Sequence, residues 1–178
     1  MQRKIRQHMK RLWILPLLAT ALMGFGGELK SFDASFEQHI IDENDKRVVY
    51  RGHVWAQRPH SAHWRYSEPV EKEVYMNGNE VVVVEPEMEQ AIVRQLREEI
   101  DFFTILSHAK PLGDGRYEAQ YDSQTFTITA DGELLVSISY RDTFDNRIEL
   151  RFGEQHQNTP IPPSTFNAEI PDGYDVIY

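Results

Sequence analysis

Apolar and polar residues alternate along most of the chain after Leu29, which is typical of β-strands that bury one face. Residues 126–130 alternate apolar side chains with threonines, and Asp131-Gly132 then supplies a hairpin turn signal. The alternation resumes over residues 134–140 and again over residues 148–152. These segments predict three consecutive antiparallel strands.

A second series of strands is predicted between Val48 and Val84. It is interrupted at Arg58-Pro59, at Glu68-Pro69 and at Asn77-Gly78. These positions fall between the predicted strands, as expected, because proline cannot donate a hydrogen bond to a sheet.

Several of these strands are apolar on both faces, most clearly residues 81–84, which are four consecutive valines. A sheet with one face in water would not need apolar residues on both sides. Two explanations remain open at this point. A helix covers one face, or a curved sheet closes around an apolar cavity.

Residues 87–108 allow two interpretations. Met88, Ile92, Leu96, Ile100 and Phe103 recur at nearly helical spacing, which favours one amphipathic helix. Alternation around residues 91–94 equally permits a strand to about residue 96, with a helix only from residue 97 onward.

The N-terminal segment has the arrangement of a secretory signal peptide. Its charges are all basic, and an apolar run from Leu12 to Phe25 follows them. Ala19-Thr20-Ala21 supplies a small-x-small cleavage site. We therefore predict a signal peptide over residues 1–21, with cleavage between residues 21 and 27, and a single domain over residues 28–178. A membrane anchor is disfavoured because the run is shorter than the ~20 residues that span a bilayer.

Composition and charge exclude several classes of function. The 178 residues are 40% apolar, which is enough for a substantial core in one domain. The chain has no Cys, which excludes disulfides, thiolate metal ligands, a Cys nucleophile and a lipid attached to an N-terminal Cys. Beyond residue 27, 14 basic residues stand against 28 acidic ones, so the body carries a net charge of −14. A field of that sign repels phosphate backbones, so no nucleic-acid partner is expected.

The sequence shows none of the patterns that catalysis or metal binding requires. His53, His60 and His63 lie near one another in the chain but lack a partner at a diagnostic metal-ligand spacing, so we interpret His60 and His63 as surface histidines. The glutamates at 85, 87, 89, 98 and 99 fit solvated faces. No nucleophile stands beside a base, and no Gly-rich phosphate loop is present. We expect no enzyme activity, no metal and no cofactor.

Arg58 is the most distinctive polar residue of the pattern. It follows Trp55-Ala56-Gln57 and precedes Pro59, which stops the strand, so Arg58 lies at the rim of the predicted sheet. Its guanidinium could bond the carbonyls of a covering helix, or it could stack on a neighbouring aromatic ring. Residue type alone leaves both interactions open.

Short motifs in a consistent order give the chain a resemblance to a known family. Residues 31–38 match the pattern S-F-x-A-x-F-x-Q, and residues 52–59 match G-x-x-W-x-x-R-P. Further matches are Trp64 to Pro69, Asn77-Gly78, Glu85-Pro86, Gln90, Phe126 to Ile128, Asp131-Gly132, Phe166 and Ile170 to Val176. Over Ser31 to Tyr178 the chain resembles the LolA-type periplasmic lipoprotein carriers.

This resemblance implies a mostly β, α+β fold, an incomplete antiparallel β-barrel of about eleven strands with a helical lid over an apolar cavity. It implies a monomeric periplasmic chaperone that shields the acyl chains of lipoproteins. The implied partners are acylated lipoproteins as cargo, an inner-membrane ABC transporter that releases them, and an outer-membrane lipoprotein acceptor. The lack of Cys separates the chain from the lipid-anchored acceptor, which shares the fold.

Residue roles also follow from the resemblance. Arg58 matches the arginine that locks the lid. The lid helix would include Ile100, Phe102, Phe103, Ile105 and Leu106, while Phe32, Phe36, Trp55 and Trp64 would line or support the cavity.

Two departures from the family pattern and one alternative function remain. Cleavage after Ala21 leaves few residues for the N-terminal lid helix of the family, and Ala62 stands where relatives carry a larger apolar residue. A periplasmic binder or sensor of another lipid, such as a glycolipid, would use the same fold.

Overall fold

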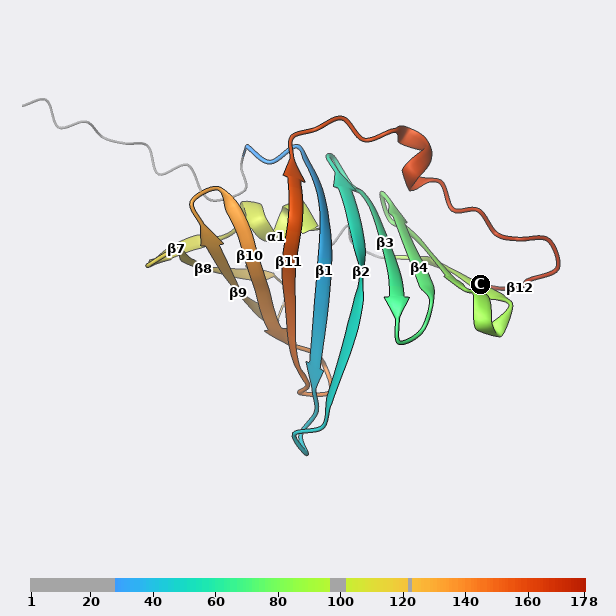
Figure 1. Ribbon diagram of the computed structural model, residues 1–178, viewed down its shortest axis with the longest axis horizontal. Coiled ribbons are helices and arrows are strands. Elements are labelled where there is room, and N and C mark those ends of the chain that lie inside the picture. The colour runs from blue at the N-terminus through green and yellow to red at the C-terminus, as the bar shows by residue number, and fades with distance from the viewer. Residues whose placement is uncertain (1–27, 97–101, 122) are drawn as a thin grey trace, which may run out of the picture.

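The described residues form one curved sheet, antiparallel except at one edge, with a single α-helix against one face (Figure 1). The computed structural model describes residues 28–96, 102–121 and 123–178. Twelve strands are present in that part of the chain, and they follow the order β12-β6-β5-β4-β3-β2-β1-β11-β10-β9-β8-β7. The predicted mostly β fold is confirmed. The sheet is one strand larger than expected because three C-terminal residues add β12, which pairs with β6 in parallel.

The elements have the following bounds. The strands are β1 (Ser31–Ile41), β2 (Arg47–Gln57), β3 (Ser61–Glu68), β4 (Lys72–Asn77), β5 (Glu80–Glu85), β6 (Gln90–Gln95), β7 (Lys110–Gly113), β8 (Arg116–Tyr121), β9 (Gln124–Asp131), β10 (Leu134–Arg141), β11 (Arg147–Gln157) and β12 (Asp175–Ile177). The helices are the 3-10 turn η1 (Pro86–Met88), α1 (Phe102–Ser107) and the 3-10 turn η2 (Pro163–Phe166).

Both predicted series of strands are present. Strands β2 to β5 are antiparallel neighbours, and their breaks fall at the predicted Pro and Gly positions. Strands β9 to β11 form the second series. Gly132 adopts a φ of 60° in the turn between β9 and β10, a conformation that favours glycine.

The centre of the sheet joins the two ends of the domain. Strand β1 pairs with β2 on one side and with β11 on the other. The three strands are each 11 residues long and run side by side in Figure 1. Because β1 and β11 are far apart in sequence, the curved sheet forms only when both halves of the chain come together.

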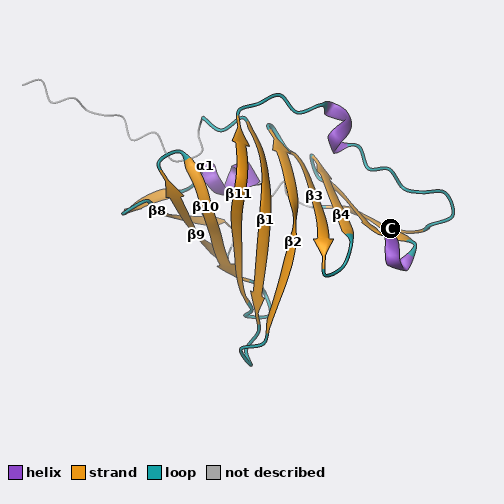
Figure 2. Cartoon of the chain, in the orientation of Figure 1, coloured by secondary structure: helices purple, strands orange, loops and turns teal. Residues whose placement is uncertain are grey.

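The two faces of the sheet bury two separate clusters of apolar side chains. The inner face, which α1 covers, holds the main core, including Phe32, Val54 and Ile128. The outer face of β4 to β6 carries a second apolar cluster that includes Tyr75, Val82 and Ala91. Ala168 and Tyr174, from the segment that follows β11, pack against this cluster. In Figures 1 and 2 this segment runs above the central strands and descends through η2 to β12.

Coverage of both faces explains the strands that are apolar on both sides. In β5, Val82 and Val84 face the second cluster, whereas Val81 and Val83 face the inner side. A covering helix therefore explains the apolar residues of the inner face only. The C-terminal segment explains those of the outer face, because it packs there.

Residues 87–108 take the strand-plus-helix form. Strand β6 pairs with β5 over residues 90–95, and α1 spans residues 102–107. The interpretation of this stretch as one amphipathic helix is wrong, because Ala91 and Val93 lie opposite Val84 and Val82 of β5. Ile100 and the predicted signal peptide lie outside the described residues. Among the described helices, none is long and apolar enough to cross a membrane.

Candidate functional site

The inner face of the sheet and α1 together form the candidate site. Three side chains of α1, Phe102, Phe103 and Leu106, are buried against the sheet. The ring of Phe102 lies 5.0 Å from the ring of Phe32 in β1, measured between centroids. Because α1 has only six residues, its place depends on these apolar contacts more than on its own hydrogen bonds.

Arg58 connects the rim of the sheet to α1. Its Nε donates a hydrogen bond of 2.8 Å to the carbonyl of Leu29, just before β1. Its guanidinium carbon lies 4.9 Å from the centroid of the Phe103 ring. The structure therefore shows the aromatic stacking that the sequence left open, whereas this carbonyl bond is not made to a covering helix. The carbonyl acceptor belongs to the segment before β1, and the stacked ring belongs to α1.

The predicted lid residues occupy different depths. Phe103 and Leu106 are almost completely buried, at 1% and 0% exposure, and Phe102 is 9% exposed. Ile105 is half-buried and packs at the edge of the same core. The helix thus fills this part of the inner face with apolar side chains.

The four predicted cavity aromatics separate onto two faces. Phe32 and Phe36 belong to the inner core, and Trp64 packs against it with its ring 5.1 Å from Phe36. Trp55 lies on the outer face, because its neighbour Val54 points inward and its cross-strand partner is His63. Periodicity could not reveal this difference, because β2 is apolar on both faces.

His63 is not a surface residue, and that prediction is wrong. It is 3% exposed and lies on the outer face between the rings of Trp55 and Tyr75. Its Nε2 lies 2.9 Å from a carboxylate oxygen of Glu73, which also accepts a hydrogen bond from the hydroxyl of Tyr75. Burial lowers the pKa of His63 despite this carboxylate. Among the described residues, no group of three or more His, Asp or Glu side chains is placed to hold a metal ion.

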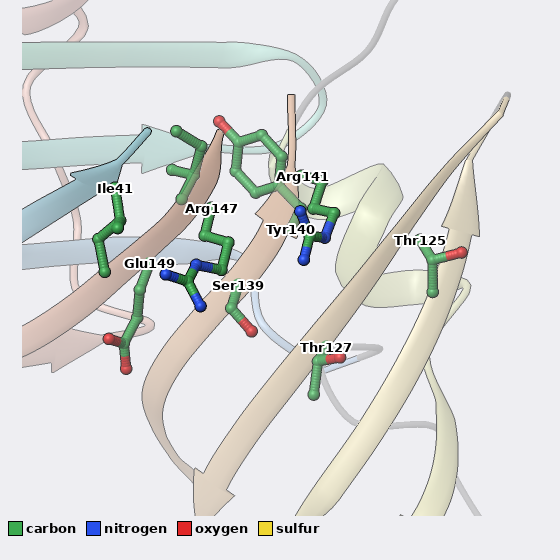
Figure 3. A pocket seen from close by; sticks show the side chains of 9 residues that line it. Ile41, Thr125, Thr127, Ser139, Tyr140, Arg141, Arg147 and Glu149 are labelled. Atoms are coloured by element: carbon green, nitrogen blue, oxygen red, sulfur yellow. The ribbon is translucent and has the colours of Figure 1, made fainter. Parts of the chain in front are cut away.

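A polar hollow on the outer face differs from the inner face in chemistry. It has a volume of about 480 Å³ and lies over β9 to β11. Figure 3 shows Thr127, Ser139 and Glu149 on the same side of neighbouring strands. The hollow is lined by the outward-facing Ile41, Thr125, Thr127, Ser139, Arg141, Arg147 and Glu149, and also by Tyr140 and Ile148, which alternate with them and direct their side chains to the inner face. Hydroxyl and charged groups of this kind would not shelter hydrocarbon.

Sequence reasoning missed a set of polar and aromatic residues on the inner face. Tyr66 and Tyr140 lie there in phase with Trp64 and Ile138, and Lys72 is opposite Tyr66. The two-residue alternation was the available signal, because it places residues 64 and 66 on one face.

Comparison with known proteins decides the family. The family model described as outer membrane lipoprotein carrier protein LolA matches residues 27–109, which include Arg58 and α1. The outer-membrane lipoprotein carrier protein of Helicobacter pylori is 36% identical over 138 residues, 78% of this chain and 74% of that protein. The chain belongs to the LolA family of lipoprotein carriers. The carrier protein of Helicobacter hepaticus is 30% identical over 90% of both chains.

A solved structure is similar to this LolA-family chain in fold alone. The crystal structure of an uncharacterized conserved protein from Thermus thermophilus covers 84% of this chain and 91% of its own, with a TM-score of 0.53. Its sequence is only 11% identical. The similarity is therefore one of architecture.

Proposed function

We propose that this protein carries lipoproteins between membranes, with their acyl chains held against the inner face of the sheet under α1. The observation that carries the proposal is the identity of at least 30% with named outer-membrane lipoprotein carrier proteins over most of the chain. The apolar inner face and the short helix on it agree with this role.

The physical need for a carrier is large. Burial of a methylene is worth about 0.8 kcal/mol, so three acyl chains of roughly 15 methylenes each oppose passage through water by a few tens of kcal/mol. A carrier removes this barrier by supplying an apolar surface in place of lipid. This task needs no catalytic residue, and we propose that the protein is not an enzyme.

Arg58 is the proposed lock of the empty form. It ties α1 to the segment before β1 through the Leu29 carbonyl and the Phe103 ring. A hydrogen bond from a charged group contributes about 1.5 to 3 kcal/mol, and a cation–π contact contributes about 0.5 to 2 kcal/mol. These values are small beside the free energy of acyl burial. The lock can therefore bias closure without preventing loading.

The remaining assignments follow the same proposal. The signal peptide over residues 1–21 would export the chain to the periplasm, where it would work as a monomer. An inner-membrane ABC transporter would load acylated lipoproteins onto it, and an outer-membrane acceptor would take them. The inner-face residues Phe32, Phe36 and Trp64 would contact the acyl chains, while Trp55 would support the sheet from outside.

A pull-down from periplasm tests the function. The tagged protein is recovered without detergent, and bound proteins and lipids are identified by mass spectrometry. We expect triacylated or diacylated lipoproteins, and we expect none when the acylated Cys of a chosen cargo is replaced by Ser. Recovery of glycolipids or other free lipids without lipoproteins would contradict the carrier function and favour a lipid binder.

A further inference from the structure

Part of the inner face is polar and lies beside the apolar core. Tyr50, Tyr66 and Tyr140, called the tyrosine cluster here, project from β2, β3 and β10 on this side. The rings of Tyr50 and Tyr66 pack edge to face, with centroids 5.9 Å apart. Tyr66 also packs edge to face on Phe36, and Tyr140 contacts Phe126. The cluster therefore borders the phenylalanines that we assign to acyl chains.

Lys72 adds a positive charge to this region. It begins β4 directly opposite Tyr66. Its ammonium lies 4.3 Å from the centroid of the Tyr66 ring and 5.9 Å from that of Tyr50. These cation–π contacts hold the ammonium on the inner face rather than out in solvent.

The donors in this region have no protein acceptors among the described residues. No carboxylate there lies within ion-pair distance of Lys72, and the hydroxyls of the tyrosine cluster make no hydrogen bond there. The adjacent inner-face carboxylate, Glu85, instead accepts a hydrogen bond from Gln90. Burial raises the pKa of Tyr66 to about 12, and the nearby hydroxyls of Tyr140 and Tyr50 add to the rise. Tyr66 therefore remains a neutral donor at any physiological pH.

An ammonium and three hydroxyl donors at the border of an apolar surface match an amphiphile with a negatively charged head. The body of the protein carries a net charge of −14 and repels anions at long range. One positive group on the inner face does not reverse this repulsion. Its effect is local, because charge-assisted hydrogen bonds to an anionic oxygen are about twice as strong as neutral ones.

We propose that Lys72 and the tyrosine cluster form a subsite for the phosphate head of an anionic glycerophospholipid, whose acyl chain lies along the neighbouring phenylalanines. The proposal rests on the proposed function only in that acyl chains enter the inner face. It adds a second class of ligand, a free acidic lipid, to the lipoprotein cargo.

Calorimetric titration with soluble lipid probes tests the subsite. The probes are palmitoyl lysophosphatidylglycerol and monopalmitoylglycerol, which share the acyl chain and ester but differ in the phosphate, each used below its critical micelle concentration. We expect the anionic probe to bind about tenfold more tightly, as one hydrogen-bonded charge pair predicts. Glycerol phosphate, which lacks the chain, should bind too weakly to measure.

Variants assign the preference to residues. Lys72→Gln should reduce the tenfold preference to about twofold or less while binding of monopalmitoylglycerol stays unchanged, which also shows that the variant is folded. Tyr66→Phe should reduce the preference about threefold. Lys110→Gln removes the same charge from exposed strand β7 and should leave the preference at wild-type level.

The outcomes separate this inference from the carrier function. Equal binding of the two lipid probes, or an unchanged preference in Lys72→Gln, would overturn the subsite and leave the hydrocarbon surface intact. Tight binding of glycerol phosphate alone would overturn the assignment to a lipid. Failure of both lipid probes to bind would overturn the subsite together with the proposed acyl-chain surface.

Discussion

Arg58 is the residue at which a single substitution should separate folding from function. We expect Arg58→Leu to lower the free energy of unfolding by about 2 kcal/mol and to leave the protein folded, because its contacts join α1 and the Leu29 segment at the rim. Return of α1 to the inner face would then be less favourable, and it would drive the release of cargo less strongly. Transfer of a bound lipoprotein to acceptor should fall roughly tenfold.

The measurement is a time course of transfer from purified loaded carrier to purified acceptor. Arg116→Leu is the matched control, because it removes an exposed arginine from β8. Normal transfer by Arg58→Leu would show that Arg58 does not lock α1 in the closed position.

His63 should make the stability of the fold depend on pH. Burial lowers its pKa in the folded protein, so the unfolded chain binds the proton more readily. The contribution of neutral His63 is complete above the unfolded value near 6.5 and is lost as the pH falls toward the lowered folded value. We expect the free energy of unfolding to decline below pH 6.5 by up to about 1.4 kcal/mol per pH unit.

Denaturant unfolding of wild type and His63→Gln between pH 7.5 and 5.5 measures this effect. The variant should show a clearly flatter pH dependence, whereas His156→Gln, at an exposed position of β11, should retain the wild-type slope. Equal slopes in wild type and His63→Gln would show that His63 does not carry the effect. The lowered pKa of Glu73, where hydrogen bonds from Tyr75 and His63 outweigh burial, acts in the same direction at lower pH.

Among single residues, Arg58 had a position that the sequence predicted and contact partners that it did not. The proline after it placed the side chain at a rim, which is a local property of the chain. The Leu29 carbonyl and the Phe103 ring are set by tertiary structure, and no local pattern contains them. The same reason applies to Trp55 and His63, because the stack of His63 between Trp55 and Tyr75 joins three strands.

Among the elements, β2 depends on a close approach at one glycine. A Cβ on Gly52 would lie 2.0 Å from the backbone oxygen of Arg65 and 2.9 Å from the Phe36 ring. We expect Gly52→Ala to cost at least about 3 kcal/mol, because the backbone of β3 cannot move away cheaply.

Gly153→Ala in β11 is the matched control for this prediction. Its Cβ would meet only the hydroxyl of Ser35, at 3.1 Å, which can rotate, so the cost should be about 1 kcal/mol or less. Thermal unfolding of the two variants provides the comparison. Equal stability of the two would contradict the described packing of β1, β2 and β3.

The strands were predictable wherever neighbours in sequence are also neighbours in the sheet. Strands β2 to β5 and β9 to β11 are such cases, because turn residues and alternation are both local signals. The identity of residues 90–95 was not decided locally, since Ala91 and Val93 fit a helix and a strand equally well. Pairing with β5 decides it, as does the parallel pairing with β12 from the end of the chain.

For the whole molecule, the pairing of β1 with β11 closes the central sheet and could not be derived from periodicity. The curved sheet and the lid were predicted from the resemblance to LolA-type carriers, and the comparisons place the chain in that family. The proposed function requires α1 to exchange its place on the inner face with acyl chains.

Release of a newly acylated lipoprotein from inner-membrane vesicles containing the ABC transporter and ATP tests this claim most directly. We predict that the purified protein brings the lipoprotein into the soluble fraction as a complex of one cargo and one carrier. An unacylated Cys→Ser cargo should form no complex. Lipoprotein that stays with the membranes at every concentration of this protein, while the Helicobacter pylori carrier releases it under the same conditions, would contradict the account.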